Sequence, residues 1–216
     1  MAGLSPDTLI RAYAQGLFPM AERHDDPTLF WIDPEKRGII PLNSFHIPRR
    51  LKRSVRKKIY EIRINTSFEE VIRTCAAPTN SRKETWINDE IINLYVDLFK
   101  MGRAHSVEAW KDNLLVGGLY GVAIGGAFFG ESMFSRARDS SKVALVHLVA
   151  KLKFSGFKLL DTQFVTGHLA QFGVVEIHRS GYHHLLSSAL DARADFLTEL
   201  PDAALEELMQ STTVTS

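Results

Sequence analysis

Cysteine is almost absent from this sequence, which contains Cys75 and no other cysteine among its 216 residues. A single cysteine cannot form a disulfide within the chain, and it has no cysteine neighbours that could complete a zinc site. The eight histidines show no HExxH or comparable spacing, so we expect no bound metal. Asp7 and Arg11 interrupt the N-terminal stretch, in which a secretory signal would need an unbroken apolar run. These absences predict a cytoplasmic protein.

The chain also lacks an excess of charge of either sign, since 26 basic and 25 acidic residues give a net charge of +1. It therefore has no overall field that would attract nucleic acid, and a polyanion would have to bind a local basic patch. The segment PRRLKRSVRKK, residues 48–58, is such a patch and contains no acidic residue. It is either a solvated helix face or a surface that contacts phosphates, and composition alone does not decide.

A membrane-spanning run is missing as well, although residues 114–130 (LLVGGLYGVAIGGAFFG) carry no charge. As a helix this stretch would span about 26 Å at about 1.5 Å per residue, short of the roughly 30 Å hydrocarbon core. Its glycines would each cost a helix about 1 kcal/mol relative to alanine. We therefore interpret the stretch as buried strands with glycine bulges, and we expect no membrane association.

The N-terminal part predicts a short helix followed by short strands. In SPDTLIRAYAQGLF, Ser5 can act as an N-cap, Pro6 suits the first turn and Gly16 ends the helix. Regularly spaced prolines then separate short strands and turns. We expect a small β-rich N-terminal unit, residues 1–62, that includes the basic segment.

The remaining residues, 63–216, predict one mixed domain. Asn88 caps a helix that ends before Gly102, and three strand-like segments with tight connections follow in HSVEAW, LLVGGLYGVAIG and GAFFGESMF. Ser140 or Ser141 then caps a helix of residues 142–155, after which a strand KLLDTQF and a helix through HHLLSSAL complete the series. This α+β order is the one expected of the acyl-CoA N-acetyltransferase (GNAT-like) fold.

Several catalytic motifs are absent. The sequence has no GxxxxGK[ST] or GxGxxG, and the GxS at Gly130 to Ser132 lacks the closing glycine of a nucleophile elbow. The place of a pyrophosphate-binding loop for acetyl-CoA reads SRARDSSK, without glycine, so we expect no cofactor.

Polar residues near strand ends are the remaining candidates for chemistry. Asp161 and Gln163 are two residues apart on a strand and so address one surface, which Glu131 can join if the two strands lie close together. Each alone is more readily explained as a structural hydrogen-bonding residue, but three that converge in apolar surroundings indicate a site.

The chain resembles the leucyl/phenylalanyl-tRNA-protein transferases across residues 5–187. The resemblance is carried by these stretches: AYAQGLFPM, WIDPEKRGIIPL, FHIPRRLKRSV, TWINDEI, GRAHSVEAW, LVGGLYGVAIGGAFFGESMFSRARDSSKVAL, LLDTQ and GHLAQFGVVEIHRSGYHHLL. HSVEAW, GESMFSR and a D-x-Q strand in this order discriminate better than any one of them alone. Met20 is a departure, because many members have tryptophan after FP.

The resemblance implies a transfer of Leu or Phe, less often Met, from aminoacyl-tRNA to the N-terminal Arg or Lys of a protein, which marks that protein for degradation. It implies a monomer without a cofactor and with an acetyltransferase-like catalytic domain. It also assigns roles: the catalytic residues are Asp161, Gln163 and Glu131; Tyr13 and Trp86 form a platform for the terminal adenosine; Ser132, Met133 and Phe134 bind substrate; Arg49, Arg50, Lys52, Arg53, Arg56 and Lys57 hold the acceptor stem.

Two other classes remain open at this point. An acetyl-CoA-dependent N-acetyltransferase would share the fold, and the glycine-free SRARDSSK loop argues against it. A non-catalytic tRNA-binding module would explain the basic segment but leave Glu131, Asp161 and Gln163 without a role.

Overall fold

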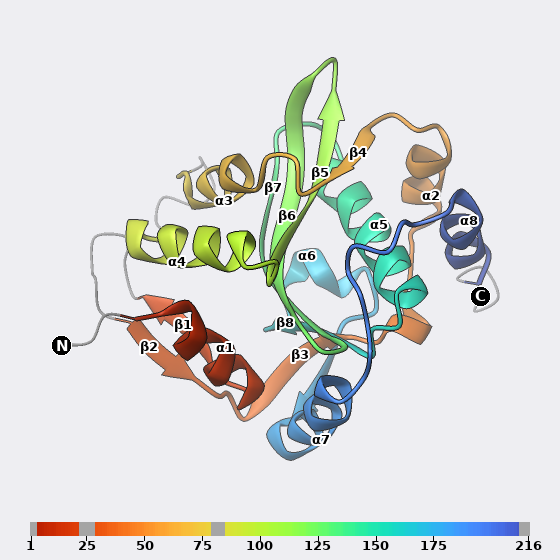
Figure 1. The fold of residues 1–216 in the computed structure, drawn as a ribbon. Coiled ribbons are helices and arrows are strands. Elements are labelled where there is room, and N and C mark those ends of the chain that lie inside the picture. The colour runs from red at the N-terminus through yellow and green to blue at the C-terminus, as the bar shows by residue number, and fades with distance from the viewer. Residues whose placement is uncertain (1–3, 22–28, 79–84, 212–216) are drawn as a thin grey trace.

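A computed structural model describes residues 4–21, 29–78 and 85–211, in which helices lie on both faces of a large sheet (Figure 1). The predicted α+β class is confirmed. In chain order the elements are α1 (Pro6–Ala14), β1 (Phe18–Ala21), β2 (Leu29–Ile32), β3 (Lys36–Ile40), the 3-10 turn η1 (Leu42–Ser44), α2 (Arg49–Arg56), β4 (Glu61–Ile64), α3 (Phe68–Ala76), α4 (Asp89–Lys100), β5 (Ala104–Lys111), β6 (Leu114–Ile124), β7 (Ala127–Ser135), α5 (Ser140–Phe154), β8 (Leu159–Gln163), α6 (Gly167–Ala170), β9 (Val175–His178), α7 (Arg179–Leu190) and α8 (Asp202–Ser211).

The sheet has seven strands in the order β4-β5-β6-β7-β8-β3-β9, and β1 and β2 form a separate antiparallel pair. The predicted meander of three strands is confirmed as β5, β6 and β7. The N-terminal strand β3 pairs with β8 and β9, so the chain returns from its N-terminal part into the large sheet. A domain boundary at residue 62 stays a prediction.

The pair β7–β8 is the one parallel pairing within the described sheet, and it is short. Residues 127–129 pair with residues 159–161, after which β7 continues to Ser135 while β8 ends at Gln163. Beyond these pairs the two strands separate and leave a gap in the middle of the sheet.

Local capping explains where the helices begin. The Ser5 side chain accepts a hydrogen bond from the Thr8 N–H and the Asn88 side chain from the Ile91 N–H, as predicted for α1 and α4. The predicted cap of α5 was wrong. Asp139, at φ 62°, occupies the cap position, and Ser140 lies in the first turn, where its hydroxyl donates to the Val116 carbonyl.

Two apolar cores lie on opposite faces of the sheet. The first includes α5, α8 and residues of α2, and the second includes α1, α3, α4 and α7 (Figure 1). The apolar stretch 114–130 forms β6 and the start of β7, as predicted. In the part of the chain that the structure describes, no helix is both long enough and apolar enough to cross a bilayer.

Glu108 shows how the polar interior is organised. Its fully buried carboxylate accepts hydrogen bonds from the Thr66 and Ser67 N–H groups at 2.9 and 2.8 Å, and from Trp110 Nε1 at 3.0 Å. The hydroxyls of Thr66 and Ser106 also donate to it. The carboxylate thereby caps the first turn of α3, because the cap residue Ser67 makes no side-chain capping hydrogen bond of its own.

Glu108→Gln should lower the free energy of unfolding by about 2–4 kcal/mol, because an amide NH2 would face donors in a buried site. Urea denaturation measures this. Glu61→Gln is the matched control: Glu61 is exposed and pairs with Arg63, so its loss should change stability far less than the loss of Glu108. Equal effects in the two variants would contradict a capping role for Glu108.

Candidate active site

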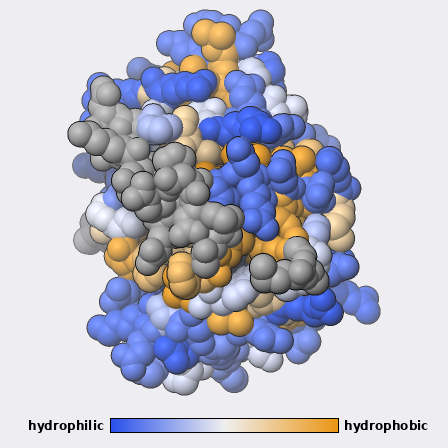
Figure 2. Space-filling view, turned by 90° about the vertical axis from the view of Figure 1, so that its left-hand side faces the viewer, coloured by the Kyte–Doolittle hydropathy of each residue, from blue (hydrophilic) through white to orange (hydrophobic). Residues whose placement is uncertain are grey.

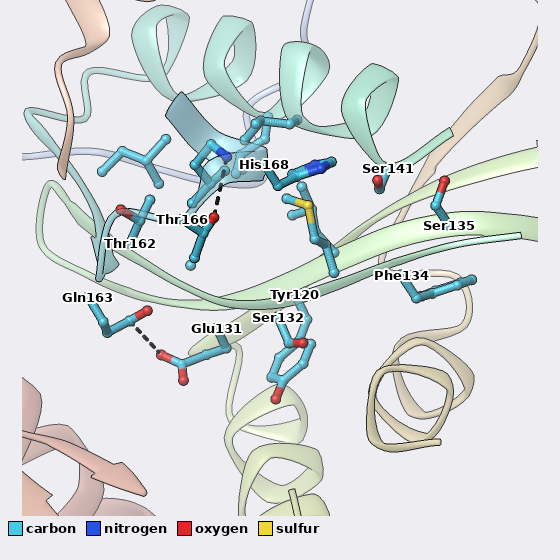
Figure 3. Close-up of a pocket in the computed structure, with 17 residues that line it drawn as sticks. Tyr120, Glu131, Ser132, Phe134, Ser135, Ser141, Thr162, Gln163, Thr166 and His168 are labelled. Atoms are coloured by element: carbon cyan, nitrogen blue, oxygen red, sulfur yellow. Dashed lines mark hydrogen bonds between the residues drawn. The ribbon is translucent and has the colours of Figure 1, made fainter. Parts of the chain in front are cut away.

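A cavity of about 420 Å³ occupies the gap between β7 and β8 (Figure 3). Most of its surface is apolar, and its lining includes residues of both cores. It is lined by Leu119, Tyr120, Gly130, Glu131, Ser132, Met133, Phe134, Ser135, Ser141, Leu145, Leu148, Leu160, Thr162, Gln163, Thr166, His168 and Leu169. The strand separation therefore creates an apolar recess that carries a few polar groups.

Glu131 and Gln163 meet across this gap. Figure 3 shows their side chains pointing toward each other from β7 and β8, and Gln163 Nε2 donates to Glu131 Oε1 at 3.4 Å. Tyr13 and Tyr95 donate to the two oxygens of the same carboxylate at 2.7 and 3.0 Å. Glu131 thus holds the amide of Gln163 and is itself held by α1 and α4.

The surroundings of Glu131 change its acidity. Burial raises the pKa of Glu131 to about 7, although the hydrogen bonds from Tyr13 and Tyr95 lower it. Burial, followed by the charge of Glu131, raises the pKa of both tyrosines well above the ordinary value. The tyrosines therefore remain proton donors, and Glu131 titrates near neutral pH.

Asp161 lies next to this pair but is fully buried and does not line the cavity. Arg37 Nη2 donates to Asp161 Oδ2 at 2.6 Å, and Tyr182 Oη donates to the same oxygen at 2.8 Å. The Gln163 N–H donates to Asp161 Oδ1 at 2.8 Å. Asp161 therefore contacts the backbone of Gln163, and Glu131 contacts its side chain.

The predicted substrate residues are distributed over the two faces. Ser132, Met133 and Phe134 all line the cavity, with Met133 packed against the core that includes α5 and Phe134 against the opposite core. Tyr13 is fully buried, and its ring centroid lies 4.7 Å from that of Phe129. Its hydroxyl reaches the site by donating to Glu131. Trp86 is partly buried against the same core as Tyr13 and lies outside the cavity.

Figure 2 shows the face that carries β1, β2, α3 and α4, where apolar patches lie among hydrophilic residues. Phe30 and Trp31 are exposed on β2, and Phe30 pairs across the strands with Met20. The adenosine platform of Tyr13 and Trp86 stays a prediction.

The basic segment forms α2 and the turn after it. Five of its residues surround a surface hollow: Arg49, Lys52, Arg53, Arg56 and Lys57. Arg50 pairs instead with Asp139 at 2.8 Å, and Arg56 also pairs with Glu206 of α8 at 2.8 Å. Contact of this segment with RNA stays a prediction.

Sequence patterns missed two groups of site residues. Arg37, Tyr95 and Tyr182 hold the catalytic candidates, and Leu145, Leu148, His168 and Leu169 complete the cavity from α5 and α6. Arg37 had a usable signal, because an arginine inside the strand-like run KRGII is unusual unless it is paired. The helical cavity residues had none, since they look like ordinary core positions.

Comparisons with known proteins identify the family of this chain. Residues 39–187 match the model of the leucyl/phenylalanyl-tRNA protein transferase family, and residues 3–35 match that of its N-terminal domain. The chain is 58% identical over 196 residues to the "Leucyl/phenylalanyl-tRNA--protein transferase" of Paramagnetospirillum magneticum, covering 91% of this chain and 94% of the relative. It is 60% identical over 190 residues to the protein of that name from Caulobacter vibrioides, covering 88% of each chain. The chain belongs to the leucyl/phenylalanyl-tRNA-protein transferase family.

Proposed function

We propose that this aminoacyltransferase moves Leu or Phe, and less often Met, from aminoacyl-tRNA to the N-terminal Arg or Lys of acceptor proteins, which marks them for degradation. We expect it to act in the cytoplasm as a monomer. The observation that supports this is the apolar recess between β7 and β8 with Glu131 and Gln163 at its polar side. An apolar side chain fits the recess, while the polar pair faces the reacting groups.

In the proposed reaction the α-amine of the acceptor attacks the ester carbonyl of aminoacyl-tRNA. A peptide bond forms, the ester C–O bond breaks, and the ribose hydroxyl of the tRNA leaves with a proton that the amine gives up. The ester is already activated, so orientation of the two reactants can supply much of the acceleration.

Gln163 and Glu131 take different parts in this step. Because Glu131 binds the Nε2 group of Gln163, the Oε1 of Gln163 is free to accept a hydrogen bond from the attacking amine. An amide is too weak a base to remove the proton, so its role is orientation. Glu131, which lines the cavity, can also attract the cationic acceptor residue, whereas buried Asp161 cannot reach it.

The titration of Glu131 gives a pH dependence with a defined sign. The folded pKa of about 7 exceeds the ordinary value of 4.5, so between these values the folded protein keeps a proton that the unfolded chain loses. Its contribution to stability is present below about pH 4.5 and is lost as pH rises to about 7, a change on the order of 3 kcal/mol. Glu131→Gln should lack this dependence of stability on pH. Chemical denaturation of both proteins at pH 4.5 and pH 8 measures the difference. Parallel curves would show that Glu131 does not titrate in this range.

The basic helix α2 should bind the acceptor stem through its phosphates. Arg49→Gln combined with Arg53→Gln is expected to weaken tRNA binding and to flatten the dependence of log K on log salt by roughly 1 to 2. Filter binding from 50 to 300 mM salt measures the slope. Lys100→Gln, an exposed change on α4, should leave the slope unaltered. An unchanged slope in the double variant would favour a solvated helix face.

A transfer assay tests the proposed function directly. Purified protein is mixed with radiolabelled Leu-tRNA and a peptide that begins with Arg, alongside the same peptide with a blocked N-terminus. Label that appears in the free peptide alone supports the proposal. Binding of tRNA without transfer would favour the non-catalytic module, and transfer from acetyl-CoA would favour the acetyltransferase.

A further inference from the structure

Every oxygen of the Asp161 carboxylate is already engaged. Oδ1 accepts from Arg37 Nε at 3.0 Å and from the Gln163 N–H at 2.8 Å. Oδ2 accepts from Arg37 Nη2 at 2.6 Å and from Tyr182 Oη at 2.8 Å. The side chain has no exposed surface and does not line the cavity. Asp161 therefore has no route by which to receive a proton from a reacting amine.

Gln163 has an unusual backbone conformation, because its φ of 58° lies in the left-handed region, which residues other than glycine rarely adopt. The Phe164 N–H donates to the Thr162 carbonyl at 2.6 Å, which closes a three-residue turn around Gln163, and the Gln163 N–H itself donates to Asp161 Oδ1, which anchors the start of this turn. β8 ends here, and the backbone bends so closely to β3 that a Cβ at Gly38 would lie 2.6 Å from the Phe164 carbonyl carbon. The direction of the Gln163 side chain toward Glu131 depends on this bend.

Arg37 secures the other side of Asp161. Its guanidinium lies between the rings of Phe18 and Tyr182, at 4.5 and 4.4 Å from their centroids, and Nη1 donates to the Gly16 carbonyl at 2.9 Å. Burial by itself lowers the pKa of Arg37, but the hydrogen bonds and charge of Asp161 raise it above its ordinary value. Arg37 remains a cation that joins the end of α1, β8 and α7.

We infer that Arg37 and Tyr182 are positioning residues for the transfer reaction, and that Asp161 acts by holding the backbone of Gln163 rather than by accepting a proton. The inference rests on the proposed function, in which Gln163 orients the amine. Arg37 and Tyr182 fix the carboxylate, the carboxylate fixes the left-handed turn, and the turn directs the amide of Gln163 toward Glu131 and the cavity.

A matched pair of double variants separates this role from proton transfer. A single change would leave one buried charge without its partner, so both variants combine Arg37→Met with a neutral residue at 161. Arg37→Met/Asp161→Asn keeps an oxygen that can accept the Gln163 N–H but cannot act as a carboxylate base. Arg37→Met/Asp161→Leu has a similar size and charge and lacks that oxygen.

Two readouts are measured on each double variant: kcat for transfer, and the φ of residue 163 in a crystal structure. We expect the Asn variant to keep φ near its original value and to lose about tenfold in kcat, because Arg37 no longer fixes the side chain of residue 161. The Leu variant should lose the left-handed turn and more than a hundredfold in kcat. Loss of more than a hundredfold in the Asn variant with the turn intact would overturn the inference in favour of a carboxylate base. A Leu variant that keeps both turn and activity would overturn it as well.

Tyr182→Phe tests the tyrosine alone, since the ring that contacts Arg37 is retained. We expect kcat to fall about threefold to tenfold with the KM for both substrates unchanged. An unchanged kcat would remove Tyr182 from the set of positioning residues. If the unchanged protein transfers nothing, the proposed function fails, and the φ of residue 163 in the two double variants still decides whether Asp161 holds the turn.

Discussion

Replacing Gln163 by glycine is expected to lower transfer by about a hundredfold or more, while the free energy of unfolding changes by less than about 1 kcal/mol. The left-handed conformation at φ 58° costs a non-glycine residue roughly 1–2 kcal/mol, and glycine adopts it without this strain. The greater chain entropy of glycine in the unfolded state offsets most of the gain. Activity falls because the group that orients the amine is removed, and misplacement by about 1 Å can already cost a hundredfold.

Single-turnover transfer and urea denaturation measure the two effects. His184→Gly is the control with the opposite pattern, because His184 is exposed on α7. Glycine in that helix should cost about 0.5–1 kcal/mol and leave transfer intact. If Gln163→Gly retained full activity, the amide would not take part in the reaction. If Gln163→Gly lowered the free energy of unfolding by several kcal/mol, the left-handed conformation would not explain why glycine is tolerated at this position.

Leu169→Trp is expected to reduce transfer of Phe by about tenfold to a hundredfold and transfer of Leu by less. Leu169 is partly exposed on the short helix α6 and lines the cavity, so a larger side chain can enter the recess without disrupting the main core. Overpacking typically costs about 1–3 kcal/mol, and a tenfold change in rate corresponds to about 1.4 kcal/mol. The aromatic substrate needs more of the cavity and should be affected first.

The ratio of kcat/KM for Phe-tRNA and Leu-tRNA, measured with one acceptor peptide, reports this change. Leu185→Trp is the matched control, because Leu185 is exposed on α7 and does not line the cavity. Equal losses for both amino acids would mean that the variant disturbs the site in general. No loss for either would mean that the amino-acid side chain binds elsewhere.

Helix caps and tight turns show which parts of the fold could be predicted from the sequence. The N-caps of α1 and α4 depend on Ser5 and Asn88, whose side chains bond to the backbone within three residues, so a short window of sequence contains the whole interaction. The meander of β5, β6 and β7 depends on tight turns and on apolar runs, which are equally local. The cap of α5 failed because Ser140 already lies within the helix, where its hydroxyl donates to the carbonyl of Val116, a residue distant in the chain.

The candidate site combines both kinds of information. Three polar residues, Glu131, Asp161 and Gln163, stood out from the sequence because they lie beside apolar runs, although the structure places Glu131 in the middle of β7 and not at a strand end. The different contacts of these residues could not be predicted. Alternation along a strand places Asp161 and Gln163 on one surface, but it cannot show that Arg37, far away in the chain, binds Asp161.

The sequence by itself therefore determined the fold class, the order of the elements from α4 to β8 and the three polar candidates for the site, because local propensities and short motifs set these. Tertiary structure decided that β7 and β8 separate after three paired residues and so form the cavity. It also decided that Tyr13 and Tyr95 hold Glu131 and that Arg37 holds Asp161. These contacts join segments that lie tens of residues or more apart, and their energies depend on burial, which exists only once the chain has folded.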